Sequence, residues 1–468
     1  MRLVPALVVS VALAACGPVP ASQSERGVAA NEEPDRRKRD KTAENHGFEL
    51  PVAFPSTYVP QASDDRFIVN AIIIDGTGQA TEANSISIVD GRIAAIGVDL
   101  DPGDTDTVDA GGRYLTPGII DIHSHLGNYP TPGVDAHGDG NEVTSPITSE
   151  VYAEHGVWPQ DPGFDEALAG GVTTLHILPG SANLFGGRGV TLRNVPSRTV
   201  QGMKFPDAPY TLKMACGENP KRVYGEKGGP DSRMGNVAGY RKNWIRAQDY
   251  LESFDGDEPP VRDLQLETLA GVLNGDILVQ MHCYRADEMA QIMDLADEFG
   301  YKVTTFHHAV ESYKIADLLA ENDVCSAMWA DWYGFKMESF DGIRENVPFV
   351  HAAGACAMIH SDDAKNVQRL NQEVAKTWAD GNRAGLDIPM EDAWQWLTRN
   401  PAKALGILDE TGTLETGKRA DMVIWSGDPF SVYSLPDTVM VDGAVLYDRE
   451  SGLKPRSDFR LGTAGDTP

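Results

Sequence analysis

The sequence predicts an α/β fold, a (β/α)8 TIM barrel over residues 116–405 with a smaller β-domain built from both ends of the chain. In the central region, short apolar runs alternate with helix-like segments, which is typical of a parallel sheet. The region has the length of such a barrel, whose core is typically about 250 residues. A doubly wound sheet is the alternative, but the sequence lacks the phosphate-binding motifs that would favour it, GxGxxG after a strand and GxxxxGK(S/T).

The β-domain is expected to comprise residues 64–115 and 406–455. Strands are predicted at 67–74, 85–89 and 92–97, and Asp90-Gly91 between the last two predicts a hairpin. The far end repeats the pattern, with strands at 422–425, 438–441 and 444–447 and a turn at Asp442-Gly443. We therefore expect a small sheet that draws strands from both chain ends.

Seven strands are predicted in the barrel region, at residues 118–125, 172–178, 211–216, 277–282, 302–308, 324–329 and 356–360. Helices are predicted after several of them, at 285–299, 311–321 and 364–382. Residues 126–162 and 179–188 are predicted as loops. In a barrel such loops carry specificity.

The N-terminus has the pattern of a lipoprotein signal peptide, predicted as residues 1–16. Arg2 precedes an apolar stretch that is too short to span a bilayer, which needs about 20 residues. The stretch ends in Leu13-Ala14-Ala15-Cys16, which resembles the bacterial lipobox, so Cys16 is the predicted lipidation site. Gly17 follows instead of an Asp that would indicate the inner membrane. We therefore expect an exported lipoprotein of the outer membrane that faces the periplasm or the exterior.

Residues 17–63 are rich in Pro, Ser, Ala and charge, and are predicted to form a disordered tether. No later segment is apolar for the roughly 18 residues of a membrane helix, so the lipid is the expected membrane contact. With 40 basic and 69 acidic residues, the net charge of −29 disfavours nucleic-acid binding. The expected partners are a small-molecule or short-peptide substrate and a further copy of the chain in a homo-oligomer.

Four cysteines remain after Cys16, too few in a chain of this length for a disulfide framework. Cys216, Cys283 and Cys356 have apolar or small neighbours. We interpret them as small core residues in preference to partners in a bridge, which an oxidising compartment would permit.

Histidines mark the ends of several predicted strands. His123 and His125 are two residues apart in a strand, so both imidazoles point the same way, as suits Zn²⁺ or a related ion. His282, the pair His307-His308, and His360 with Asp362 end later strands. Because the carboxyl ends of parallel barrel strands meet at one mouth, these side chains are predicted to converge there.

This arrangement resembles the amidohydrolase superfamily over residues 66–450, and most closely its imidazolonepropionase-like branch. The resemblance implies a small β-sandwich made by the two chain ends. It also implies five metal ligands, namely His123 and His125 on strand 1, His282 on strand 5, His308 (or alternatively His307) on strand 6, and Asp362 on strand 8.

Binuclear members of that superfamily have a bridging carboxylated lysine or a glutamate on strand 3 or 4. Lys213 and Glu218 are the candidates, and Lys213 is favoured because an unmodified amine is costly inside an apolar run. A mononuclear site with neither residue remains open. The implied cofactor is one or two divalent ions, most plausibly Zn²⁺.

The implied function is a metal-dependent hydrolase that cleaves a C–N bond of an amide, peptide or cyclic amide with an activated water. Asp362 is the predicted catalytic residue, accepting a proton from the water and passing it to the leaving group. The predicted substrate-binding residues are Asn183, Arg222, Tyr284 and Arg285. A dipeptide or an N-acyl amino acid would suit an exported enzyme. The alternatives are a heterocycle deaminase and a non-catalytic surface binding protein on the same fold.

Overall fold

The computed structural model describes residues 46–453. Cys16 and the predicted signal peptide lie outside the described residues, as does most of the predicted tether. Within the described part, no helix is both long enough and apolar enough to cross a membrane.

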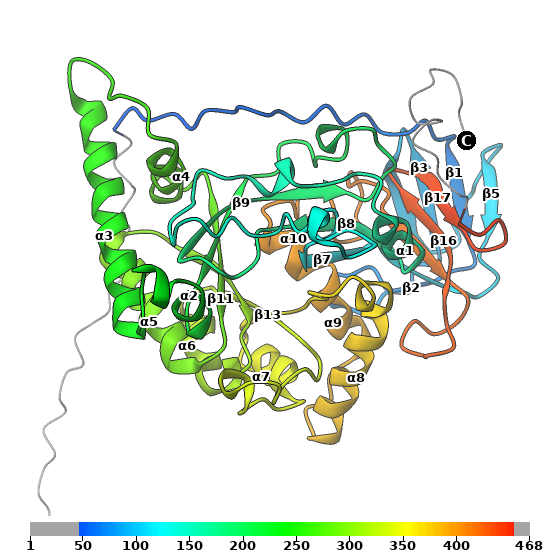
Figure 1. The fold of residues 1–468 in the computed structure, drawn as a ribbon. Helices are drawn as coiled ribbons and strands as arrows, with labels where there is room; N and C mark the ends of the chain where they lie inside the picture. The colour runs from blue at the N-terminus through cyan, green and yellow to red at the C-terminus, as the bar shows by residue number, and fades with distance from the viewer. Residues whose placement is uncertain (1–45, 454–468) are drawn as a thin grey trace, which may run out of the picture. The chain divides into compact units, whose positions relative to one another are not determined.

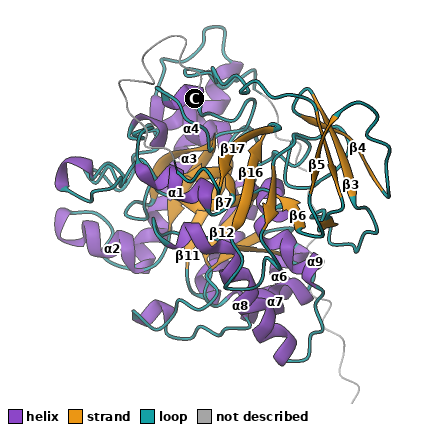
Figure 2. Ribbon diagram, turned by 90° about the vertical axis from the view of Figure 1, so that its right-hand side faces the viewer, coloured by secondary structure: helices purple, strands orange, loops and turns teal. Residues whose placement is uncertain are grey.

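The central sheet has eight strands in the order β14-β13-β12-β11-β10-β9-β8-β7. All seven strands predicted in this region are present, and their bounds are β7 Ile119–Ser124, β8 Val172–Ile177, β10 Thr211–Ala215, β11 Leu278–Cys283, β12 Val303–His308, β13 Cys325–Met328 and β14 Cys356–Ile359. Three residues beyond the end of β14, the amide of Asp362 donates to the carbonyl of His123 in β7 at 3.0 Å. The sheet is therefore a nearly closed barrel, and helices surround it in Figure 2.

The remaining barrel strand, β9 (Phe185–Arg193), corrects the prediction in two ways. Its first residues were expected to be a loop, and the strand runs antiparallel to both neighbours, β8 and β10. The third strand of the barrel therefore returns through a tight connection at the mouth instead of through a crossover helix. Its segment Phe185-Gly186-Gly187-Arg188 looks like a loop because glycines and a buried arginine interrupt the apolar pattern.

The helices follow or flank the strands, with bounds α1 Pro162–Ala169, α2 Glu218–Tyr224, α3 Arg233–Glu252, α4 Leu264–Leu273, α5 Ala286–Phe299, α6 Ala316–Glu321, α7 Asn346–Ala352, α8 Leu370–Arg383, α9 Met390–Trp394 and α10 Arg399–Ala404. Ser232 and Asp263 cap the amino ends of α3 and α4 by accepting backbone N–H groups. Gly300, with φ of +77°, ends α5 in the left-handed conformation that glycine adopts without strain.

Strands from both chain ends form two further sheets (Figure 1). One has the order β4-β3-β1-β5 and the other β17-β16-β15-β6-β2. Their bounds are β1 Arg66–Val69, β2 Ile72–Ile73, β3 Ser85–Val89, β4 Arg92–Gly97, β5 Asp106–Asp109, β6 Tyr114–Pro117, β15 Met422–Trp425, β16 Pro436–Val441 and β17 Ala444–Asp448. Ile68 and Ile86 of the first sheet share an apolar core with Met422 and Ile424 of the second, so the sheets pack face to face.

A buried ion pair joins the barrel to these sheets. The guanidinium of Arg193, at the end of β9, donates to both carboxylate oxygens of Asp421, at 2.6 and 2.5 Å, and lies 3.1 Å from Asp442. The Arg193 and Asp421 side chains are almost inaccessible to solvent. Such an arrangement fixes orientation because each charge needs the other to offset its desolvation.

Residues 46–63 correct the prediction that the tether extends to residue 63. They have no regular secondary structure, but they run as an extended strap from the α3–α4 region toward the sheets, in blue in Figure 1. Phe48 is 2% exposed and packs on Phe254, and the Tyr58 hydroxyl donates to Asp442. Apolar burial and specific hydrogen bonds therefore hold a segment whose composition alone indicates disorder.

Two disulfides correct the interpretation of the cysteines as unpaired core residues. Cys216 pairs with Cys283, and Cys325 pairs with Cys356. Cys325 and Cys356 are opposite one another in the register of the parallel strands β13 and β14, and Cys216 and Cys283 lie one residue beyond the last paired residues of β10 and β11. Register depends on the assembled sheet, so a cysteine's local neighbours in the sequence do not reveal its partner.

Candidate metal centre

Three predicted ligands meet at the carboxyl ends of β7 and β14. His123 and His125 bring their Nε2 atoms to 3.3 Å from each other. One carboxylate oxygen of Asp362 lies 3.5 Å from the first and 3.3 Å from the second. These three side chains form a group whose ligand atoms all lie within 4.8 Å of one another.

A chain of hydrogen bonds sets the tautomers of these histidines. His307 donates from Nε2 to the side-chain oxygen of Gln280 at 2.7 Å, so its Nδ1 accepts from Nδ1 of His123 at 2.8 Å. His125 donates from Nδ1 to the carbonyl of Leu178 at 2.8 Å. In both rings Nδ1 is therefore engaged, and Nε2 is the nitrogen that faces the Asp362 carboxylate and is placed to bind a metal.

His307 thus has both ring nitrogens engaged, and the structure does not give it the role of an alternative ligand. It orients His123 from the interior of the barrel. His308, the residue favoured over it, stacks on Trp329 and has a ring nitrogen close to those of His123 and His360.

A second group lies next to the first. His123, His308 and His360 have ligand atoms within 4.8 Å of one another, and the ring of His282 lies 4.6 Å from that of His308, centroid to centroid. Non-glycine residues with positive φ occur at His308 (+68°) and Asp362 (+47°). Such backbone costs on the order of 1–3 kcal/mol and is concentrated at functional sites.

The donor set fits a divalent cation. Both ring nitrogens of His282, both of His360, and Nδ1 of His308 are buried without a hydrogen-bond partner among residues 46–453. Each buried polar atom left without a partner costs roughly 1–3 kcal/mol. The presence of five such nitrogens in one place therefore indicates a bound group, such as a metal ion, that pairs with them. The converging Nε2 atoms of His123 and His125 beside a carboxylate lead to the same conclusion.

Burial keeps the ring nitrogens available. It lowers the pKa of His123, His282 and His308 well below the usual value, and the positive charge of Lys213 lowers each further. At neutral pH these rings are therefore uncharged. The carboxyl of Asp362 behaves in the opposite way, because its interactions with His125 outweigh the effect of burial and lower its pKa.

Lys213 lies on β10, is fully buried, and donates from Nζ to the carbonyl of Pro179 at 3.1 Å. Burial lowers the pKa of its ammonium to about 7, with Asp362 acting in the opposite direction. The neutral amine is therefore far more accessible near neutral pH than it is for an exposed lysine. A neutral amine is the form that reacts with CO₂, so its state is compatible with the predicted carboxylated lysine.

An aromatic wall borders the centre on the side of β11 and β13. Tyr284 packs on His282 and His308, with centroid distances of 5.0 and 5.2 Å, and Trp329 stacks on His308 at 4.4 Å. Phe335, 59% exposed, lies 5.9 Å from Trp329. This places the predicted residue Tyr284 next to the candidate ligands.

Three other predicted residues are directed elsewhere. Glu218 lies at the start of α2 with its carboxylate 3.5 Å from Lys336, so the structure does not bring it to the histidines. Asn183 is 2% exposed, and its side-chain amide donates to the carbonyls of Glu142 and Ser145, which holds the loop after β7 in place. Both are corrections, because the Glu218 carboxylate faces Lys336 and the Asn183 amide donates to backbone carbonyls.

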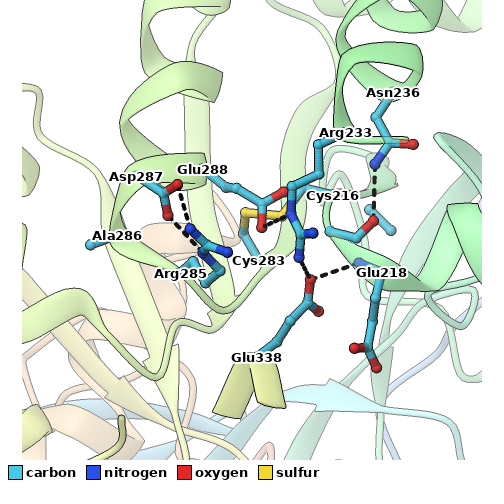
Figure 3. Close-up of a disulfide and its surroundings, with 12 residues drawn as sticks. Cys216, Glu218, Arg233, Asn236, Cys283, Arg285, Ala286, Asp287, Glu288 and Glu338 are labelled. Atoms are coloured by element: carbon cyan, nitrogen blue, oxygen red, sulfur yellow. Dashed lines mark hydrogen bonds and ion pairs between the residues drawn. A yellow bond between two sulfur atoms is a disulfide. The ribbon is translucent and has the colours of Figure 1, made fainter. Parts of the chain in front are cut away.

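Arg285 is also corrected, because its guanidinium forms a two-pronged pair with Asp287, at 2.9 and 2.8 Å (Figure 3). Arg222 is different. It is exposed on α2, and its charge acts on the Tyr284 hydroxyl, whose pKa burial raises. It remains a candidate for contact with substrate.

Sequence reasoning missed three contributors. His360 was recognised as the end of a strand but was not assigned as a ligand, although its position two residues before Asp362 is a signal for it. Gln280 is two residues before His282 in the same strand, so its side chain lies on the same face of the sheet. The carbonyls of Leu178 and Pro179 carry no signal in a sequence, because every residue has one.

Comparison with known proteins agrees with this fold and site. Residues 114–446 match the sequence model of the amidohydrolase family. The protein therefore belongs to the amidohydrolase family.

Several individual proteins are similar to this chain. Amidohydrolase tasK of Hapsidospora irregularis is 31% identical over 395 residues, which is 78% of this chain but 39% of that protein, so the chain spans well under half of its length. An imidazolonepropionase of Rhizobium rhizogenes is 24% identical over 77% of this chain and 91% of its own length. The crystal structure of an amidohydrolase from Thermotoga maritima MSB8 superimposes with a TM-score of 0.76 at 33% identity, covering 82% of this chain and 100% of that one.

Proposed function

We propose that this protein is a metal-dependent hydrolase of C–N bonds in amides, peptides or cyclic amides. The observation that carries the proposal is the convergence of the Nε2 atoms of His123 and His125 on the carboxylate of Asp362. Two imidazole nitrogens and a carboxylate oxygen at this separation form a ligand set that a divalent cation would bind. His308, His360, His282 and Lys213 would complete a centre for one or two ions, most plausibly Zn²⁺.

A bound divalent ion would supply Lewis acidity and a water molecule with a pKa near 7 in place of about 15.7. Asp362 lies at the edge of the centre, with 23% of its side chain exposed. Its low pKa keeps it ionised at neutral pH, so it would accept a proton from the attacking water. The same carboxyl group, once protonated, would deliver that proton to the leaving nitrogen.

The substrate is proposed to be a small molecule or a short peptide, such as a dipeptide or an N-acyl amino acid. Tyr284 and Trp329 offer apolar surface beside the candidate ligands, and Arg222 offers a cation on the same side. An arginine in this position would suit a substrate carboxylate. We further propose that the enzyme acts outside the cytoplasm as a lipoprotein attached through Cys16.

The test is metal stoichiometry combined with turnover. Residues 17–468 are loaded with Zn²⁺ and bicarbonate, freed of excess ion, and analysed by mass spectrometry, with His123→Ala/His125→Ala as the matched control. One or two ions per chain, lost from the control together with the hydrolysis of N-acyl amino acids or dipeptides, is the expected result. Equal metal content in both proteins would refute the proposal, and metal without hydrolysis of any amide would favour a binding protein.

A further inference from the structure

We infer that the Cys216–Cys283 disulfide positions two strands of the metal centre, so that the ion nearest Lys213 and His282 binds more weakly without it. The inference rests on the proposed function, because it concerns the metal that this function requires. It assigns a role at the site to two residues that contact no metal and no substrate.

The bridge lies one residue beyond the paired part of β10 and β11. Ala215 is opposite His282 in the register, and the amide of Cys216 donates to the carbonyl of His282 at 2.9 Å. Side chains alternate along a strand, so Lys213 and His282 point to the face opposite the cysteines. The disulfide is buried on the outer face of the barrel, at the level of the ligands on the inner face, with Cys283 0% exposed.

Little else fixes these two residues. His123 and His125 are each held by a ring hydrogen bond, whereas neither ring nitrogen of His282 has a partner in the described part of the chain. Lys213 has one bond, to the carbonyl of Pro179. The separation between Lys213 and His282 is therefore set mainly by the backbones of their strands, which the disulfide locks at the open end.

Noncovalent contacts also hold together the segments that follow the two cysteines. Just past the bridge, the amide of Glu218 donates to the carboxylate of Glu338 at 2.7 Å. Arg233 joins that carboxylate to Glu288, 2.9 Å from its Nε, on the helix that follows Cys283 (Figure 3). The segments that follow Cys216 and Cys283 are thus both linked to the guanidinium of Arg233. Loss of the disulfide is therefore expected to loosen the strands without unfolding them.

The second disulfide is a built-in control. Cys325 and Cys356 are opposite one another at the first residues of β13 and β14, the ends away from the mouth. No candidate ligand is adjacent to either cysteine. Both bridges therefore stabilise the fold, but the ligands lie beside one of them alone.

The experiment compares Cys216→Ala/Cys283→Ala with Cys325→Ala/Cys356→Ala. Each full chain without its signal peptide is loaded with Zn²⁺ and bicarbonate, and the Kd of each ion is measured by competition with a chromophoric chelator. In the first pair we expect the Kd of one ion, which we assign to the position nearest Lys213 and His282, to rise about 10–100-fold, the range for the loss of groups that orient metal ligands. The other ion, and both ions of the second pair, should change less than about twofold, while thermal unfolding temperatures fall in both pairs.

A wild-type protein that holds no ion overturns the proposed function. A wild-type protein that holds ions with a Kd unaffected by loss of Cys216–Cys283, or affected equally by loss of either bridge, overturns this inference alone. If the wild type holds a single ion, the same comparison applies to that ion. If the alanine pair does not fold, Cys216→Val/Cys283→Ala restores the lost apolar volume and is measured in the same way.

Discussion

Replacement of Lys213 by methionine should stabilise the metal-free protein while removing a group assigned to the proposed metal centre. Burial lowers the pKa of the Lys213 ammonium from 10.5 to about 7, which means that the charged form is unfavourable in the folded state. The unfolded chain binds more protons than the folded protein between these two values, so stability rises with pH in this window. Below pH 7 the full cost of burying the charge is present.

The magnitude follows from the same two pKa values. Linkage gives a cost of about 4 kcal/mol at pH 7 and about 2 kcal/mol at pH 9. Methionine has a similar length but cannot donate to the carbonyl of Pro179. Loss of that hydrogen bond reduces the gain in stability by about 1 kcal/mol. Lys213→Met should therefore gain about 3 kcal/mol at pH 7 and about 1 kcal/mol at pH 9.

Urea unfolding with a chelator and without bicarbonate measures both values, because metal and carboxylation would otherwise stabilise the wild type. The control is Lys204→Met. The Nζ atom of Lys204 lies 3.2 Å from the carboxylate of Glu154, which is 1% exposed, so this variant should lose about 3–5 kcal/mol. The reasoning is wrong if Lys213→Met is less stable than the wild type at pH 7, or if its gain does not shrink at pH 9.

Three further predictions concern other parts of the molecule. Arg193→Met leaves the carboxylate of Asp421 buried and unpaired and should lower the free energy of unfolding by about 3–5 kcal/mol. Arg241→Met removes a solvent-exposed pair and should leave the same urea titration nearly unchanged. Asp362→Asn should keep bound metal by mass spectrometry but lower kcat by about 10²–10⁴-fold, and near-normal turnover would remove its catalytic role. Phe48→Ala should cost about 3–5 kcal/mol, and no change in the denaturation midpoint would show that the strap contributes nothing.

Periodicity along the sequence was sufficient to predict most of the barrel. The seven parallel strands each bury both faces, so they appear as apolar runs, and their ends agree with the structure to within a residue or two. Strand β9 escaped because Arg188 and Arg193 are buried in it, and their partners are remote in sequence. Arg193, for example, is neutralised by Asp421, which only the assembled fold brings near.

The candidate site divides in the same way. His123, His125 and Asp362 were predicted because strand alternation and strand ends are local properties. Asn183 and Arg285 were chosen because polar groups near strand ends favour binding. Asn183 is instead satisfied by backbone carbonyls of the loop that follows β7, and Arg285 by Asp287 in the first turn of α5. Sequence reveals which groups are present near a mouth, but not which of them the protein has already paired.

The antiparallel return of β9 has a consequence for how this protein can be redesigned and for how its sequence can change in evolution. At that turn, the mouth is lined by the peptide carbonyls of Leu178 and Pro179, which receive His125 and Lys213. Every residue has the same backbone carbonyl. Substitutions at this turn can therefore shift the backbone but cannot change the chemical group that His125 and Lys213 contact. A library intended to change specificity should therefore leave this turn untouched and vary the loop that carries Trp329 and Phe335, where each codon changes the surface that a substrate meets.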